Sequence, residues 1–109
     1  MAYDEQLVAR VREALAGREA VSERKMFGGL AFMLDGNMCC GVIGDELVLR
    51  LGPDGADEAL DKPHTRPMDF TGRPLKGFVF VAARGVETDD GLRSWVEQAA
   101  EFAASLAPK

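Results

Sequence analysis

The chain has 109 residues, with 13 lysines and arginines against 18 aspartates and glutamates, so its formal net charge is −5. This length suits one compact domain, and we expect residues 1–109 to form it. The sequence pI near 4.8 disfavours direct nucleic-acid binding, because neutralising phosphates requires clustered lysines and arginines. The N-terminal residues are charged and no long apolar stretch follows, which predicts a cytoplasmic protein without a membrane-spanning segment.

Residues 4–16 carry apolar side chains at helical spacing, which predicts a first helix. Asp4 is suited to cap the start of this helix and Gly17 to end it. The following residues, 18–25, are mostly polar and show no periodicity, so we interpret them as a charged connector.

The pattern then changes to short apolar runs at residues 30–34, 38–43 and 47–51. They are separated by Asp-Gly and Gly-Asp turns, and these sequences favour hairpins because they accept positive φ angles. An antiparallel meander of three strands is predicted. Cys39 and Cys40 are adjacent in the second run and should point to opposite faces, so we expect reduced thiols rather than a disulfide.

The second half predicts a short helix at residues 54–61 and an ordered loop or edge strand at residues 62–77, which contain three prolines. A strand at residues 78–83 and an amphipathic helix at residues 89–106 complete the chain. The fold class is therefore α+β with two layers, helices on an antiparallel sheet, in the order α-β-β-β-α-(β)-β-α.

The predicted strands are apolar at nearly every position, whereas a sheet with one wet face should alternate apolar and polar residues. Something must therefore cover the second face, either the long loop or another subunit. Because the chain has little length left for such a cover, we predict a homodimer.

No catalytic or metal-binding set emerges from the residues. The two cysteines lie in an apolar run, and the single histidine, His64, lies in a loop without a matching nucleophile. A zinc site needs about four ligands, so we expect no metal, no cofactor and no enzymatic activity. Met26-Phe27-Gly28-Gly29 lacks the lysine of a phosphate loop and precedes a strand, and we interpret it as a backbone bend with close packing.

One segment departs from the acidic character of the chain. Between residues 62 and 76 lie four basic residues, Lys62, Arg66, Arg73 and Lys76, against one acid, Asp69. Two interpretations remain open. In the first, Asp69 pairs with Arg66 or Arg73 to hold the loop, and Arg50 lies on the solvent side of its strand. In the second, Arg50, Arg66, Asp69, Arg73 and Lys76 form a surface for an acidic partner or a phosphate.

Three stretches together resemble the N-terminal domain of the TfoX/Sxy family, regulators of competence for DNA uptake. They are residues 25–32 (KMFGGLAF), the strand residues Gly41-Val42 with Leu47-Val48-Leu49-Arg50, and residues 66–79 (RPMDFTGRPLKGFV). The resemblance implies a helix-flanked α+β domain of the kind also seen in secretion chaperones, and it supplies no catalytic residues. Such regulators carry a second, C-terminal domain, and we expect this chain to be a standalone N-terminal-type domain.

We therefore expect a non-enzymatic, dimeric protein-interaction module, linked by resemblance to transcription regulation, with an unidentified protein partner. The alternative is a binder of a small anionic ligand, or an enzyme acting on one. In that alternative Arg50, Arg66 and Arg73 converge on the ligand at a dimer seam.

Overall fold

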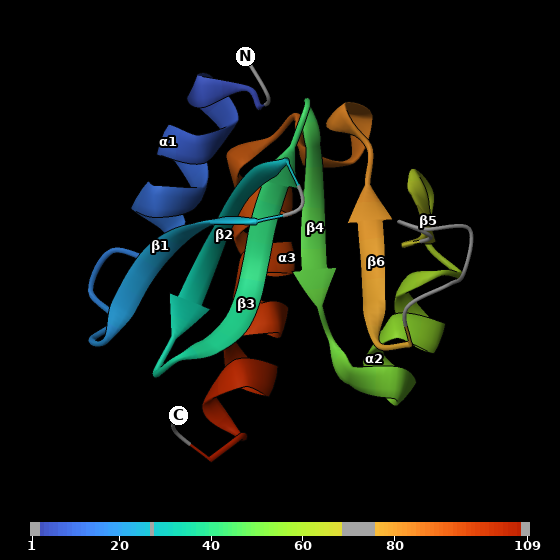
Figure 1. Ribbon diagram of the computed structural model, residues 1–109. Coiled ribbons are helices and arrows are strands. Elements are labelled where there is room, and N and C mark those ends of the chain that lie inside the picture. The colour runs from blue at the N-terminus through green and yellow to red at the C-terminus, as the bar shows by residue number, and fades with distance from the viewer. Residues whose placement is uncertain (1–2, 27, 69–75, 108–109) are drawn as a thin grey trace.

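A computed structural model describes residues 3–26, 28–68 and 76–107 of the chain (Figure 1). Within these residues the elements are, in chain order, α1 (Glu5–Ala14), β1 (Val21–Met26), β2 (Gly29–Leu34), β3 (Asn37–Ile43), β4 (Glu46–Arg50), α2 (Gly52–Ala59), β5 (Thr65–Pro67), β6 (Phe78–Val81), the 3-10 helix η1 (Ala83–Val86) and α3 (Asp89–Ala104).

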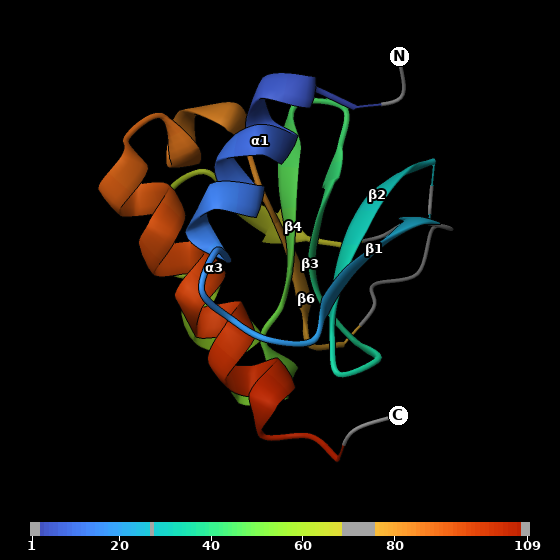
Figure 2. The same cartoon turned by 90° about the vertical axis from the view of Figure 1, so that its left-hand side faces the viewer.

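The strands form one antiparallel sheet in the order β1-β2-β3-β4-β6-β5. The turned view shows α1 and α3 side by side on one face of this sheet (Figure 2). Residues of α2 belong to the same core as those of α1 and α3, so all three helices cover the same face. The predicted two-layer α+β class is thereby confirmed.

The helix ends follow local chemistry. The Asp4 carboxylate accepts hydrogen bonds from the backbone N–H groups of Gln6 (2.8 Å) and Leu7 (3.3 Å), as expected of a helix cap. Gly17 has a φ of 94° just beyond α1, which glycine adopts without steric cost. The short helix α2 begins at Gly52, two residues earlier than predicted, because Pro53 fits the first turn of a helix.

Residues 21–26 correct one expectation, because they form the edge strand β1 rather than a connector. This strand pairs along its whole length with β2, from Val21 opposite Leu34 to Met26 opposite Gly29. Its side chains are exposed or half-buried, so the strand carries no apolar alternation. The backbone hydrogen bonds to the apolar strand β2 stabilise β1. Hydrophobic periodicity in the sequence does not reveal such a strand.

The two glycines that precede β2 have different roles. Gly28 has a φ of 75°, which supplies the reversal between β1 and β2. A Cβ atom at Gly29 would overlap the carbonyl oxygen of Val42 on the neighbouring strand. The interpretation of this motif as a bend with close packing is therefore confirmed.

The second face of the sheet is buried within this one chain. Its cluster consists of Ala31, Met33, Met38, Val48, Met68 and Phe80, each at most 9% exposed. Met68, which follows the edge strand β5, is itself completely buried against this face. Figure 2 also shows β1 and β2 curving away from the plane of β4 and β6. The apolar second face therefore does not require a second subunit to cover it. The observation from which the homodimer was predicted no longer supports that prediction.

Cys39 and Cys40 correct a further expectation. Phe32 pairs with Cys40 and Met33 pairs with Met38, so a β-bulge leaves Cys39 as an extra residue in β3. Both cysteines consequently belong to the core beneath the helices instead of pointing to opposite faces. Both are free thiols, in agreement with the predicted reduced state.

Candidate functional site

Arg66 lies on the edge strand β5 and is held by two contacts. Its guanidinium group donates a hydrogen bond to Glu46 Oε1 at 2.6 Å, and its central carbon lies 4.1 Å from the centroid of the Phe80 ring. Among the described residues its ion-pair partner is thus a residue of β4, whereas the predicted pairing of Asp69 with Arg66 or Arg73 involves residues outside them. The Arg66 side chain remains 49% exposed, so its charge is both oriented and accessible.

Arg50 ends β4 and is half-buried rather than on the solvent side of the strand. Its guanidinium carbon lies 5.9 Å from the ring centroid of Phe78 and 5.7 Å from that of Phe102. These distances allow cation–π attraction to rings from the sheet and from α3. Arg50 thus links the two layers.

Three other predicted residues come from the segment after β5. Asp69 and Arg73 lie outside the described residues. Lys76 is exposed and precedes Gly77, whose carbonyl accepts a hydrogen bond from the backbone N–H of Leu51 at 2.7 Å. Arg50 and Arg66 engage different phenylalanines, so the structure shows no shared site for them.

The cysteines contact each other inside the core. Hydrogen bonding between the adjacent thiols lowers the pKa of Cys39, and this effect outweighs that of burial. For Cys40, the hydrogen bond and burial both raise the pKa. Both side chains are at most 1% exposed, which fits small buried hydrophobes better than nucleophiles.

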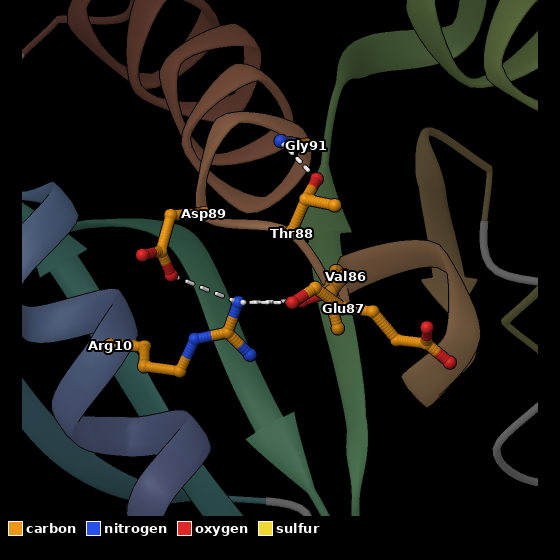
Figure 3. A network of polar contacts seen from close by, with 6 residues as sticks. All are labelled: Arg10, Val86, Glu87, Thr88, Asp89 and Gly91. Carbon is orange, nitrogen blue, oxygen red and sulfur yellow. Dashed lines mark hydrogen bonds and ion pairs between the residues drawn. The ribbon is translucent and has the colours of Figure 1, made fainter.

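A polar network at one end of the molecule joins α1 to the beginning of α3 (Figure 3). Arg10 donates hydrogen bonds to the carbonyl of Val86 at 2.7 Å and to Asp89 Oδ1 at 3.3 Å. Thr88 caps α3 by accepting a hydrogen bond from the backbone N–H of Gly91 at 3.0 Å. The hollows beside Arg10 measure about 40 and 100 Å³, below the size of small-molecule sites. We interpret this network as structural.

A larger cavity, of about 300 Å³, lies where the turn before β5, η1 and α3 meet. Lys62, His64, Arg84 and Trp95 contribute to its wall. The sequence indicates Lys62 as part of the basic segment and His64 as an isolated loop residue. It gives no indication of Arg84, because the residues that meet here come from three separate segments of the sequence.

Residues 3–26, 28–68 and 76–107 contain no group of three or more His, Cys, Asp or Glu side chains arranged to hold a metal ion. None of the helices in these ranges is long and apolar enough to cross a membrane.

Comparison with protein families found a match to the TfoX N-terminal domain over residues 13–103. The matched region includes every strand of the sheet and most of α3. Searches among curated proteins and among solved structures found no significant match.

Proposed function

Because the chain belongs to the TfoX N-terminal domain family, we propose that it is a non-enzymatic protein-interaction module in the regulation associated with that family. The family is linked in general to competence regulation and is not known as an enzyme family. We place the module in the cytoplasm. The proposed partner surface comprises Arg66 on β5, Asp69, Arg73 and Lys76 from the segment of the sequence after β5, and Arg50 at the end of β4.

The orientation of Arg66 is the observation that carries this proposal. Arg66 stands on a three-residue edge strand that has a strand partner on one side only, among the described residues. Its contacts with Glu46 and Phe80 fix the guanidinium group before any partner arrives. A fixed, half-exposed arginine beside an aromatic ring loses little conformational freedom on binding, which favours recognition of an acidic protein.

A charge swap separates binding from stability. Arg66→Glu alone places two acidic side chains together, so the variant should unfold at a lower temperature than the wild type. The double variant Glu46→Arg/Arg66→Glu restores the ion pair, and its melting temperature should return toward that of the wild type. The charge at position 66 remains reversed, so an acidic partner should no longer bind.

The readout is affinity capture from nuclease-treated lysate of the source organism, with bound proteins quantified by mass spectrometry. A protein captured by the wild type and lost with the charge-swapped variant supports the proposal. Equal capture of the same proteins by both baits would show that the Arg66 charge is structural. Nuclease treatment separates protein partners from contacts bridged by nucleic acid.

We propose the homodimer on new grounds, namely the edge strand β1. Its outer edge has no strand partner among the described residues, and it carries Glu23, Arg24 and Lys25. Because both signs of charge occur, a second copy can pair antiparallel with opposite charges facing each other. Light scattering after size-exclusion chromatography should give a dimer mass, and Arg24→Glu/Lys25→Glu should give a monomer. A monomer mass for the wild type at micromolar concentration refutes the dimer.

The alternative, an anionic ligand held jointly by Arg50, Arg66 and Arg73, has less support. Arg50 is half-buried and lies against the rings of Phe78 and Phe102, whereas Arg66 lies against Phe80. A ligand held by both arginines would have to draw Arg50 away from its two rings.

A further inference from the structure

The cavity of about 300 Å³ differs from the rest of the surface in its charge. Three basic side chains, Lys62, His64 and Arg84, contribute to its lining, and none of the described residues in the lining is acidic. The chain as a whole has a net charge of −5, so a lining that contains basic side chains and none of the described acidic ones departs from its average composition. Its volume is at the lower end of the range for small-molecule sites.

The basic groups of the cavity are available to a ligand. Within the described residues, the ion pairs are Arg10–Asp89, Arg12–Glu23 and Arg66–Glu46, and none of them involves a cavity residue. The side chains of Lys62, His64 and Arg84 also make no hydrogen bond to another described residue. The charges of Lys62 and Arg84 are therefore not neutralised by the part of the chain that the structure describes.

The backbone fixes the position of His64. This residue has a φ of 67°, a conformation that non-glycine residues adopt at a cost in free energy. The carbonyl of His64 accepts a hydrogen bond from the backbone N–H of Ala82 at 2.8 Å, which holds the turn against the end of β6. A Cβ atom at Gly85 would lie 2.5 Å from the Val81 side chain and 3.1 Å from the Cβ of His64, so a larger residue at position 85 would crowd His64.

The remaining wall comes from α3. Lys62 Nζ lies 5.5 Å from the centroid of the Trp95 ring, a distance that allows a cation–π contact and orients the ammonium group. Ser94 and Gln98 line the cavity one helical turn apart and supply a hydroxyl and an amide. Charged and neutral hydrogen-bond donors thus line one open hollow.

We propose that this cavity binds a small organic anion that carries a phosphate or carboxylate group. The anionic group accepts hydrogen bonds from Arg84, His64 and Lys62, and Ser94 and Gln98 contact the polar remainder. The cavity is distinct from the interaction surface around Arg66 and Lys76, so either assignment can fail without the other.

Trp95 provides the measurement, because it is the single tryptophan of the chain and lies in the cavity wall. Its fluorescence is followed while the full chain is titrated with inorganic phosphate, ribose 5-phosphate or citrate at constant ionic strength. Isothermal titration calorimetry repeats each titration independently of fluorescence. Saturable binding of at least one probe supports the proposal. Binding of phosphate points to a phosphate group on the ligand, and binding of citrate points to a carboxylate group. Responses no larger than those to sodium chloride overturn it.

Two variants locate the binding. Arg84→Gln removes an exposed charge, and His64→Asn retains a residue type that tolerates positive φ. Each should raise the dissociation constant by about tenfold, equivalent to about 1.4 kcal/mol, while the unfolding midpoint of Arg84→Gln stays unchanged.

Arg93→Gln is the matched control, because Arg93 lies on α3 and lines a different hollow. It should bind the probe like the wild type. A loss of affinity in Arg93→Gln equal to that in Arg84→Gln would indicate general charge attraction and overturn the assignment. Arg84→Gln keeps the test decisive even where His64→Asn fails to fold.

Discussion

The guanidinium group of Arg10 and the backbone carbonyl of Val86 are joined by a 2.7 Å hydrogen bond across 76 positions of sequence. This bond ties α1 to the end of η1, immediately before α3 begins. Because η1 ends there, its last carbonyls need partners from outside the helix. Arg10 satisfies one of them and pairs with Asp89 as well.

Replacing Arg10 should therefore destabilise the fold. Arg10→Ala removes a half-buried, charge-assisted hydrogen bond, and we expect a loss of about 1–3 kcal/mol in the free energy of unfolding. Urea unfolding followed by circular dichroism measures this loss. Arg93→Ala, an exposed arginine on α3, is the control and should change stability little. Equal stability of both variants would show that the Arg10 contacts contribute nothing.

Gly29 and Gly28 should respond differently to substitution. Gly29→Ala places a methyl group against the Val42 carbonyl of the neighbouring strand, which we expect to cost about 1–3 kcal/mol or more through strain. Gly28→Asn has no close neighbours to displace, and asparagine tolerates its positive φ. In thermal unfolding, Gly28→Asn should have a clearly higher melting temperature than Gly29→Ala. The reverse order would mean that the turn at Gly28 tolerates substitution less well than the strand contact at Gly29.

The ion pair between Arg12 and Glu23 predicts a dependence of stability on pH. Hydrogen bonding to Arg12 lowers the pKa of Glu23 below the ordinary value of a glutamate. A carboxyl with a lowered pKa in the folded state stabilises the fold above its ordinary pKa, and the contribution is lost as the pH falls through the lowered value. The Glu23→Gln variant should thus be slightly less stable than the wild type at neutral pH.

The difference in stability between the wild type and Glu23→Gln should vanish in acid, well below the ordinary pKa of a glutamate. Unfolding midpoints of both proteins, measured from neutral to acidic pH, test the direction of this change. A difference that grows toward low pH would contradict the assignment of the pair.

The thiols predict an order of chemical modification. Because the thiolate is the reactive form, Cys39, with its lowered pKa, should be alkylated before Cys40 in the folded protein. Burial should make both reactions much slower than in denatured protein, where the two thiols should react alike. Tandem mass spectrometry after timed exposure to iodoacetamide assigns the modified residue. Modification of Cys40 first would refute the proposed contact.

The fold could be predicted where the side-chain pattern is strong. The first and last helices follow from apolar spacing, and the strands near Phe32, Val48 and Val79 follow from apolar runs with turn residues between them. β1 could not be predicted, because its polar side chains resemble those of a loop and its partner strand stabilises it. The bulge at Cys39 also has no signature in the sequence, since it is a property of the pairing between strands.

The site was predictable only in part. A cluster of basic residues in one segment drew attention to Arg66, but its partners Glu46 and Phe80 come from other strands. The cavity shows the same limit, because Arg84 and Trp95 join Lys62 only after the sheet and α3 have packed together. Charge composition indicates which side chains are available, and tertiary packing decides which of them meet.

The order of the strands has a consequence for the rate of folding. Each of β1 to β4 pairs with its neighbour in the chain, so these hairpins close across short loops at little entropic cost. The contact between Arg10 and Val86 spans most of the sequence and should form after the meander. Variants of the hairpins should therefore slow refolding, whereas the loss of the Arg10 contact should chiefly speed unfolding.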